Sequence, residues 1–420
     1  MENYLAAISL VFLVAVLLLG FWKKVNMGFL AMGAALIIAR LGGIPDKTVI
    51  SNFSTSLFIS LVGPAFLFSI AVANGTIDLL ARKILKLAGN NTWCIPLILA
   101  IVTFVLSALG CGNIPTFAIM LPMSIALALE LGIDAIAMGI IITAACNFGC
   151  MSPIANGGLI LIGLLPEAQN AGQISWSVFG NSCVAFVLIT VAFYFIYKLY
   201  KPKSNSLEML DHVTAFNRNQ KITILAIALV VLVVFVFGIN IGLVAPLAGV
   251  VLIMIRVGDQ KAAIKIMPWG TFILVCGVNM LMGVVRALGG IDLMVGGLTS
   301  LMSGAAVKPI ISLAAGAMSW FSSTTGVVMP ALIPSITGII EKFSSVSFSA
   351  LASGITITAF IAAFSPASTG GAGIMAQYAV FNQDASEEDT NKLFIRLFLT
   401  SVVCVFVSVI LAFVGVYDIF

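Results

Sequence analysis

Long apolar runs alternate with short polar connections along almost the whole chain. One membrane-spanning helix needs roughly 20 apolar residues, and on that measure the pattern predicts ten helices, five in each half. They are expected at 4–21, 27–42, 55–74, 133–165 and 177–199, then at 221–238, 241–256, 268–288, 346–381 and 394–417. Two of these stretches, 133–165 and 346–381, are too long for one ordinary span.

Each of the two overlong stretches is interrupted by the same short phrase. Residues 152–158 read Ser-Pro-Ile-Ala-Asn-Gly-Gly, and residues 365–371 read Ser-Pro-Ala-Ser-Thr-Gly-Gly. Proline removes a backbone donor and paired glycines loosen the backbone, so a continuous helix avoids this combination. In lipid, broken backbone persists only where protein buries it or where it lines a polar cavity. We therefore predict two broken helices whose unwound segments lie near the midplane and mark a binding site.

Two pairs of shorter apolar segments precede the broken helices. They lie at about 94–110 with 115–131, and at 307–320 with 326–341, and each pair is joined by a polar, glycine-containing tip. The first tip is Cys111-Gly112-Asn113, and the second is Ser-Ser-Thr-Thr-Gly at 322–326. This pattern predicts two re-entrant hairpins, an inner one at about 94–131 and an outer one at about 307–341.

The two halves repeat one another at a nearly constant offset. Asn26-Met27-Gly28 matches Asn240-Ile241-Gly242, and Gly63 matches Gly277, both at an offset of 214. Such self-similarity indicates a duplication, with one repeat at 1–200, a linker at 201–220 and the second repeat at 221–420. Five spans per repeat is an odd number, so the second repeat is expected to be inverted.

Charge placement agrees with inversion. With the linker in the cytoplasm, 15 of the 20 lysines and arginines face inward and five face outward, as the positive-inside rule requires. The predicted fold is an all-α polytopic protein of the inner (plasma) membrane. It has about ten spanning helices, two re-entrant hairpins and two inverted-topology repeats, and both termini lie outside.

Composition limits the function classes. Hydrophobic residues make up 61% of the chain and charged residues 9%, and the net charge is only +4; a nucleic-acid partner is therefore not expected. The seven cysteines form no metal-ligand pattern, because Cys146 and Cys150 lack third and fourth ligands. No nucleophile with a base or metal set appears, so neither an enzyme nor a cofactor is expected.

An amphipathic stretch follows the third helix of each half, at 78–87 and 292–302. In the first of them Arg82, Lys83 and Lys86 stand at helical spacing. Two readings stay open: an interfacial arm at the cytoplasmic headgroups, or an ordinary solvated face.

The tips and the breaks together predict two similar polar nests. The first combines Gly112, Asn113 and Thr116 with Ser152, Ala155 and Asn156; the second combines Thr324, Thr325 and Gly326 with Ser365, Ser368 and Thr369. The alternative is that these small polar residues only pack helices tightly. Neither nest contains a charged residue, which disfavours a carboxylate or histidine proton relay. Hydroxyl and carbonyl oxygens can hold sodium, and amide and hydroxyl donors can hold a substrate carboxylate. Glu130 and Asp134 are interpreted as solvated charges at a helix end.

These motifs resemble the ion-transporter superfamily of carboxylate carriers, which includes the divalent-anion/sodium symporters, and within it the malonate-carrier (MatC-like) family. The symporters carry Ser-Asn-Thr at each tip with a proline nine residues after the Asn. Here Asn113 stands nine residues before Pro122, and Thr325 nine before Pro334. Their broken helices carry Thr-Pro-x-Gly-Thr, and the corresponding residues here are Ser-Pro-Ile-Ala-Asn and Ser-Pro-Ala-Ser-Thr. Neither tip keeps the full Ser-Asn-Thr triplet, so the resemblance implies the general position of the sodium and carboxylate sites but not every ligand.

The resemblance implies site residues and a mode of action. Sodium would be held by Gly112, Asn113, Ser152 and Ala155 in one nest and by Thr324, Thr325, Ser365 and Ser368 in the other. Substrate would contact Asn113, Thr116, Asn156, Thr324, Thr325 and Thr369. The family also implies a homodimer and an elevator-type motion of hairpins and broken helices against a scaffold.

The leading hypothesis is a secondary active transporter, a sodium-coupled symporter of small carboxylates and above all of a dicarboxylate. One alternative is the large membrane subunit of a binding-protein-dependent carboxylate transporter. Another is a proton-coupled carrier of a different organic anion. A channel is disfavoured, because paired broken helices with re-entrant tips favour alternating access over a continuous pore.

Overall fold

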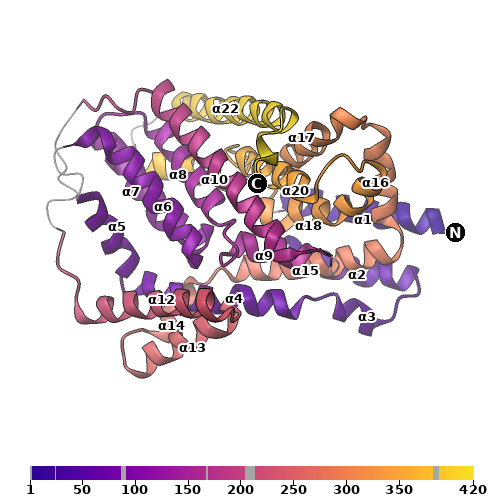
Figure 1. Ribbon diagram of the computed structural model, residues 1–420, viewed down its shortest axis with the longest axis horizontal. Coiled ribbons are helices and arrows are strands. Elements are labelled where there is room, and N and C mark those ends of the chain that lie inside the picture. Colours follow the sequence, from indigo (N-terminus) through magenta and orange to yellow (C-terminus); the bar gives the residue numbers. More distant parts are fainter. Residues whose placement is uncertain (1, 24, 87–90, 167–168, 204–212, 382–386) are drawn as a thin grey trace.

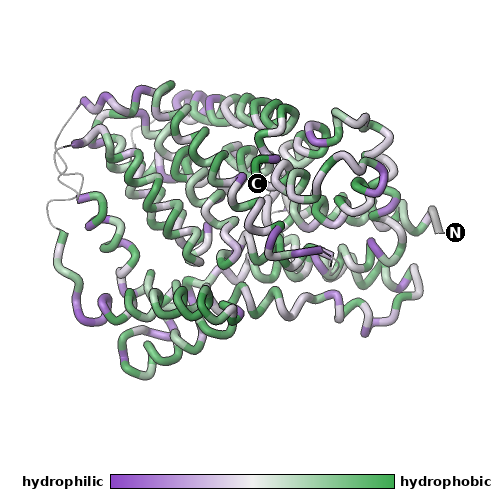
Figure 2. The backbone as a smooth tube through the Cα atoms, viewed as in Figure 1, coloured by the Kyte–Doolittle hydropathy of each residue, from purple (hydrophilic) through white to green (hydrophobic). Residues whose placement is uncertain are grey.

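The computed structural model describes the chain except residues 1, 24, 87–90, 167–168, 204–212 and 382–386. The described residues form helices joined by short connections, and no strand occurs among them. Hydrophobic residues cover long stretches of the helices, whereas polar residues gather at helix ends and in the connections (Figure 2). This distribution confirms the predicted all-α membrane protein.

The same order of elements occurs in both halves. The first half contains α1 (Glu2–Lys23), α2 (Met27–Leu41), α3 (Asp46–Ser51), α4 (Thr55–Ala73), α5 (Thr76–Lys86), α6 (Ile95–Leu106), α7 (Asn113–Glu130), α8 (Ala135–Gly149), α9 (Asn156–Leu164) and α10 (Ala171–Ile196). The second half contains α12 (Arg218–Phe237), α13 (Ile241–Met254), α14 (Gln260–Ile266), α15 (Trp269–Ala287), α16 (Gly290–Ser300), α17 (Val307–Ser319), α18 (Met329–Leu332), α19 (Ile336–Lys342), α20 (Phe348–Ala362), α21 (Thr369–Phe381) and α22 (Glu387–Phe413). Helices α18 and α19 belong to one longer segment, Thr324–Lys342, which corresponds to α7. The inverted orientation of the halves stays a prediction, as do the repeat boundaries.

Several predicted spans differ in length from the observed helices. Within the described residues, eight helical segments are long and apolar enough to cross a membrane, or nine if the bent pair of α16 and α17 is one span. Helices α10 and α22 begin six and seven residues before the predicted 177 and 394, whereas α2 and α13, which Asn26 and Asn240 cap, match their predicted ranges to within two residues. The predicted linker 201–220 includes residues 204–212, which lie outside the described residues.

The matched glycines explain how the two halves pack. Helix α2 crosses α15, and α13 crosses α4 (Figure 1). A Cβ on Gly28 would lie 2.2 Å from the carbonyl oxygen of Ile273, and one on Gly63 would lie 2.4 Å from that of Gly242. The two crossings are reciprocal, because each joins the second helix of one half to the fourth helix of the other. Small residues permit such backbone approach in membrane proteins.

The asparagines of the repeated Asn-x-Gly motif secure these crossings. Asn26 and Asn240 cap α2 and α13 by accepting hydrogen bonds from the backbone N–H groups of Gly28 and Gly242 at 2.8 and 2.7 Å. The Asn26 amide also donates to the Gly270 carbonyl at 2.9 Å. The four crossed helices therefore form a tightly packed frame, which we call the scaffold.

Helix α5 lies beside α6 and begins near the ends of α4 and α12 (Figure 1). Ile77, Ala81 and Leu85 on its apolar face are buried, and its basic residues lie on the more exposed side. The predicted amphipathic segment is therefore a helix whose apolar face packs on the protein.

Candidate functional site

The first hairpin has a tip that only glycine allows. Helix α6 continues into a π-helical turn, Ser107–Cys111, and α7 begins at Asn113. Gly110 and Gly112 have φ values of 107° and 81°, a region that residues with side chains rarely adopt. A Cβ on Gly112 would also lie 3.2 Å from Oδ1 of Asn156. The tip therefore brings backbone, rather than side chain, up to the broken helix.

The first broken helix is interrupted as the sequence predicts. Helix α8 ends at Gly149, residues 150–155 form turns, and α9 begins at Asn156. The Gly158 N–H donates to the Cys150 carbonyl at 3.0 Å. A Cβ on Gly158 would lie 2.1 Å from the Ser152 carbonyl oxygen. The second glycine of the phrase is thus required by the tightness of the turn.

The second broken helix repeats this geometry. The Gly371 N–H donates to the Ala363 carbonyl at 3.0 Å, and a Cβ on Gly371 would lie 2.3 Å from the Ser365 carbonyl oxygen. In both copies the serine carbonyl accepts a 2.9 Å hydrogen bond from the N–H three residues later, that of Ala155 or Ser368. The repeated phrase therefore encodes one turn, built twice.

Two asparagines join the first tip to the first break. The Asn156 amide donates from Nδ2 to Oδ1 of Asn113 at 2.9 Å, and Oδ1 of Asn156 accepts from the Asn113 backbone N–H at 3.4 Å. Neither α7 nor α9 has a side-chain hydrogen bond from its N-cap residue, Gly112 or Ala155. Two helix N-termini that receive no side-chain cap from their own N-cap residues therefore converge at one place.

Hydroxyl groups hold the second tip together. A hydrogen bond of 2.9 Å joins the side chains of Ser319 and Thr324, and Ser323 caps the turn by accepting from the Gly326 N–H at 3.2 Å. Ser368 of the second break donates to the Ser322 carbonyl at 3.4 Å. Each tip therefore contacts the break of its own half, as the sequence predicts.

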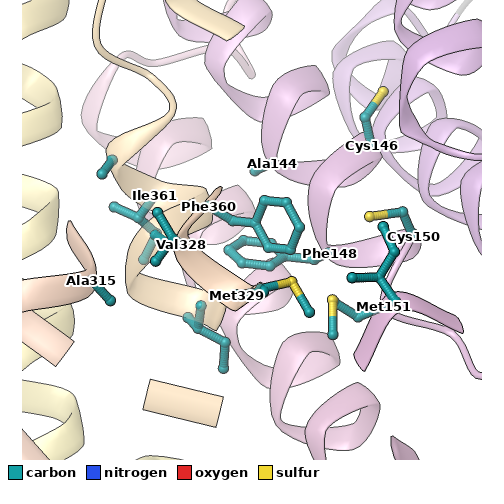
Figure 3. Packing of buried hydrophobic residues seen from close by; sticks show 14 of the residues in the cluster. Ala144, Cys146, Phe148, Cys150, Met151, Ala315, Val328, Met329, Phe360 and Ile361 are labelled. Carbon is teal, nitrogen blue, oxygen red and sulfur yellow. The ribbon is translucent and has the colours of Figure 1, made fainter. Parts of the chain in front are cut away.

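The two nests interlock, but apolar side chains separate their polar groups. Phe148 and Phe360 pack edge to face with ring centroids 6.3 Å apart, and Met151 and Met329 lie beside them (Figure 3). Helix α21 packs against α7 and α8, while α9 contacts α18. Among the hydrogen bonds of the described residues, none joins one nest to the other. The hairpins and the broken helices thus pack as one body around an apolar centre.

The first nest faces the scaffold across a small cavity. The cavity measures about 20 Å³ and is lined by Gly112 and Asn156, by Pro64 of α4 and by Thr271 and Phe272 of α15. A water molecule needs about 10–15 Å³, whereas sites for small organic ligands measure several hundred Å³. In this conformation the site is closed around a volume suited to water.

The comparisons with known proteins agree with this geometry. The family model for citrate transporters, CitMHS, matches residues 16–357, which is more than half of the chain. The chain belongs to the citrate transporter family. This family is part of the ion-transporter superfamily, so the predicted superfamily is confirmed; the finer likeness to malonate carriers stays a prediction. Comparison with curated protein sequences finds no match.

Two solved structures are similar to this chain in fold. The YdaH transporter of Alcanivorax borkumensis, described as having an unusual topology, gives a TM-score of 0.60 at 12% identity, with 88% of this chain and 87% of that chain covered. MtrF of Neisseria gonorrhoeae, described with a class of antimetabolite efflux pumps, gives 0.61 at 14% identity, with 87% and 83% covered. At these identities the likeness shows the fold alone. Membership of the citrate transporter family, rather than this likeness, makes the chain a multi-pass membrane transporter and not an enzyme.

The remaining predicted site residues occupy different environments. Thr116 is fully buried, and its hydroxyl lies beside the Cys111 thiol. Ser152, Ala155, Thr325 and Ser365 are also buried. Thr369 is exposed at the first position of α21, on the open side of its nest. The structure thus brings the predicted residues together within each nest, and their individual roles stay predictions.

Sequence reasoning placed Ser322 and Ser323 in the second tip without giving them a role, and it did not single out Ser319. Ser319 pairs with Thr324, Ser322 supplies a carbonyl to Ser368, and Ser323 is the cap. The cap had a recognisable signal, since a serine three residues before a backbone donor at a helix start is a common N-cap arrangement. The contact of Ser319 depends on the π-helical turn at Thr324–Val328, which no local pattern indicates.

Proposed function

We propose that this protein is a sodium-coupled symporter of small di- and tricarboxylates. The observation that supports this proposal is that helix N-termini lie beside hydroxyl and carbonyl oxygens in two nests without charged residues. The nests pair α7 with α9 and the start of Thr324–Lys342 with α21.

Helix N-termini favour anions, because their free N–H groups and the helix dipole carry partial positive charge. In the first nest the N-termini of α7 and α9 converge through Asn113 and Asn156. A carboxylate can accept from these N–H groups and from the asparagine amides without a permanent positive charge nearby. This arrangement suits a small carboxylate that must bind and leave again.

Sodium is favoured over a proton as the coupling ion. The nest residues named above carry no ionisable carboxyl, imidazole or amine group. Their neutral oxygens include the buried hydroxyl of Thr116 and the carbonyls of the two turns. Hydroxyl and carbonyl oxygens of this kind can coordinate a hard cation, whereas a proton relay needs titratable groups.

The closed cavity supports alternating access of the elevator type. The scaffold is fastened by backbone-to-backbone glycine crossings, and the hairpins and broken helices pack on one another as a second body. A substrate larger than about 20 Å³ can enter the first nest only if this body and α4 or α15 separate. A homodimer in the plasma membrane with both termini outside is part of the same proposal, which rests on the charge split and the family resemblance.

Uptake by the purified protein in proteoliposomes tests the proposal. Labelled citrate and succinate should accumulate under an inward sodium gradient, and a proton ionophore should leave the initial rate unchanged. Uptake without any added soluble protein would also exclude dependence on a binding protein. Accumulation that follows a proton gradient and ignores sodium would overturn the coupling.

A further inference from the structure

An apolar groove of about 470 Å³ lies between the first hairpin and the scaffold. It is lined by Leu80 of α5, Leu109 of the hairpin tip region, Phe68 of α4, and Ala228 and Phe235 of α12. The groove therefore touches both bodies that the proposed transport cycle would move apart. It is distinct from the cavity at Gly112 and Asn156, with which it shares no lining residue.

Helix α12 leaves the groove open to the surroundings. Only three of its residues, Gln220, Thr223 and Val230, are buried. Leu232 and Phe235 line the groove while remaining 56% and 55% exposed. In a bilayer, such a groove faces lipid chains rather than water.

Basic side chains gather where the groove reaches α5 and the start of α12. On α5, Lys83 lies three residues beyond Leu80, which places it on the same helix face, and Lys86 follows in the last turn. On α12, Lys221 lies three residues before Ile224, a lining residue. Lys83 also lies 5.0 Å from the ring centroid of Phe216, just before α12.

Hydrogen bonds fix the two helices relative to each other. Asn74, at the start of α5, donates from Nδ2 to the Thr223 hydroxyl of α12 at 2.9 Å. Gln220 donates from Nε2 to the Asn74 carbonyl at 3.3 Å. The acidic residue of α5, Asp78, forms a 2.9 Å ion pair with Arg82, four residues later. The lysines of α5 and α12 are therefore held at one end of an otherwise apolar groove.

The second half lacks this feature. Helix α16 corresponds to α5, and its sequence, Gly-Ile-Asp-Leu-Met-Val-Gly-Gly-Leu-Thr-Ser, contains no lysine or arginine. The basic cluster is thus present on one of two otherwise similar helices. The basic residues of α5 are therefore not a requirement of the duplicated fold, because α16 occupies the corresponding place without them.

We propose that this groove binds one anionic phospholipid, with its headgroup at Lys83, Lys86 and Lys221 and an acyl chain along α12. A phospholipid matches both parts of the site, because its charged and apolar ends occur in the same order as the basic cluster and the groove. The bound acyl chain would contact both the hairpin and the scaffold, so its presence would affect how these two bodies move relative to each other. This proposal does not depend on which carboxylate is transported.

Lipid titration of the detergent-purified, full-length protein tests the proposal. Phosphatidylglycerol and phosphatidylcholine are added separately, and bound lipid is counted by native mass spectrometry. Each basic residue near an anionic surface contributes about 1 kcal/mol, or about fivefold in affinity. Lys83→Gln with Lys86→Gln should therefore weaken phosphatidylglycerol binding by roughly 30-fold. The matched control is Lys261→Gln with Lys265→Gln on α14, which removes the same charge from an exposed helix.

A second pair of variants tests the apolar part. Ala228→Trp fills the groove from the exposed side of α12 and should lower affinity for long-chain phosphatidylglycerol. Leu229→Trp, whose position lies outside the groove lining, should have no effect. Equal binding by all variants would overturn the proposal. So would equal losses in the α5 and α14 variants, or full competition by inorganic phosphate, which would indicate a simple anion site.

Discussion

The substitution Asn156→Asp tests the first nest with a nearly isosteric change. The aspartate can still accept from the Asn113 N–H, but it cannot donate to Oδ1 of Asn113, which lies 2.9 Å from the present Nδ2. The lost hydrogen bond costs about 1 kcal/mol. The new negative charge has a larger effect, because it faces the incoming carboxylate.

The size of this effect follows from Coulomb's law. Two unit charges 4 Å apart repel by about 4 kcal/mol at an effective dielectric constant of about 20, and by about 2 kcal/mol at twice that distance. One decade of affinity corresponds to about 1.4 kcal/mol. Citrate affinity, measured by calorimetry on the purified protein, should therefore fall by about 30-fold to about 1000-fold.

The matched control for this variant is Asn170→Asp. Asn170 caps α10 by accepting from the Gln173 N–H at 3.2 Å, and aspartate caps a helix equally well. Its citrate affinity should stay within about twofold of wild type, because the position lies outside both nests. If Asn156→Asp folds with an unchanged melting temperature and binds citrate as wild type does, the assignment of the nest is wrong.

The remaining predictions concern packing. Gly28→Ala should lower the melting temperature by an amount equivalent to about 1–3 kcal/mol, because its Cβ would lie 2.2 Å from the Ile273 carbonyl oxygen. Gly33→Ala, with open space around it, is the control on the same helix; equal effects of the two would refute the crossing. Asp134 and Arg396 form a half-buried ion pair of 2.7 Å, so Asp134→Asn and Arg396→Gln should each destabilise the protein while the double variant loses less than the sum. Thermal unfolding of the four proteins gives the coupling, expected at about 0.5–3 kcal/mol, and additive losses would contradict a direct interaction.

The breaks and tips could be predicted from sequence because their causes are local. Pro153 and Pro366 cannot continue a hydrogen-bonded helix, and the glycines after them meet carbonyl oxygens of the same turn. The tip at Gly112 also has a local cause, because glycine adopts a positive φ more readily than residues with side chains. The positions of both nests can therefore be predicted from these local residues.

Other features depend on contacts between distant segments. The match of Gly63 with Gly277 indicated a duplication, but only the fold shows that each glycine meets a helix of the other half. Asp134, interpreted from sequence as a solvated charge, instead pairs with Arg396 across the two halves. The apolar contact between the nests, through Met151 and Met329, was also not evident from sequence, since methionines in an apolar run carry no positional signal.

A structure determined in the presence of sodium citrate tests the central claim most directly. Our account predicts citrate at the paired tips and breaks, with at least one carboxylate at the N-termini of α7 and α9 beside Asn113 and Asn156. It also predicts that the cavity against Pro64 and Phe272 is wider than in the closed form. Citrate bound away from both nests, for instance in the apolar groove between α10 and α22, would contradict it.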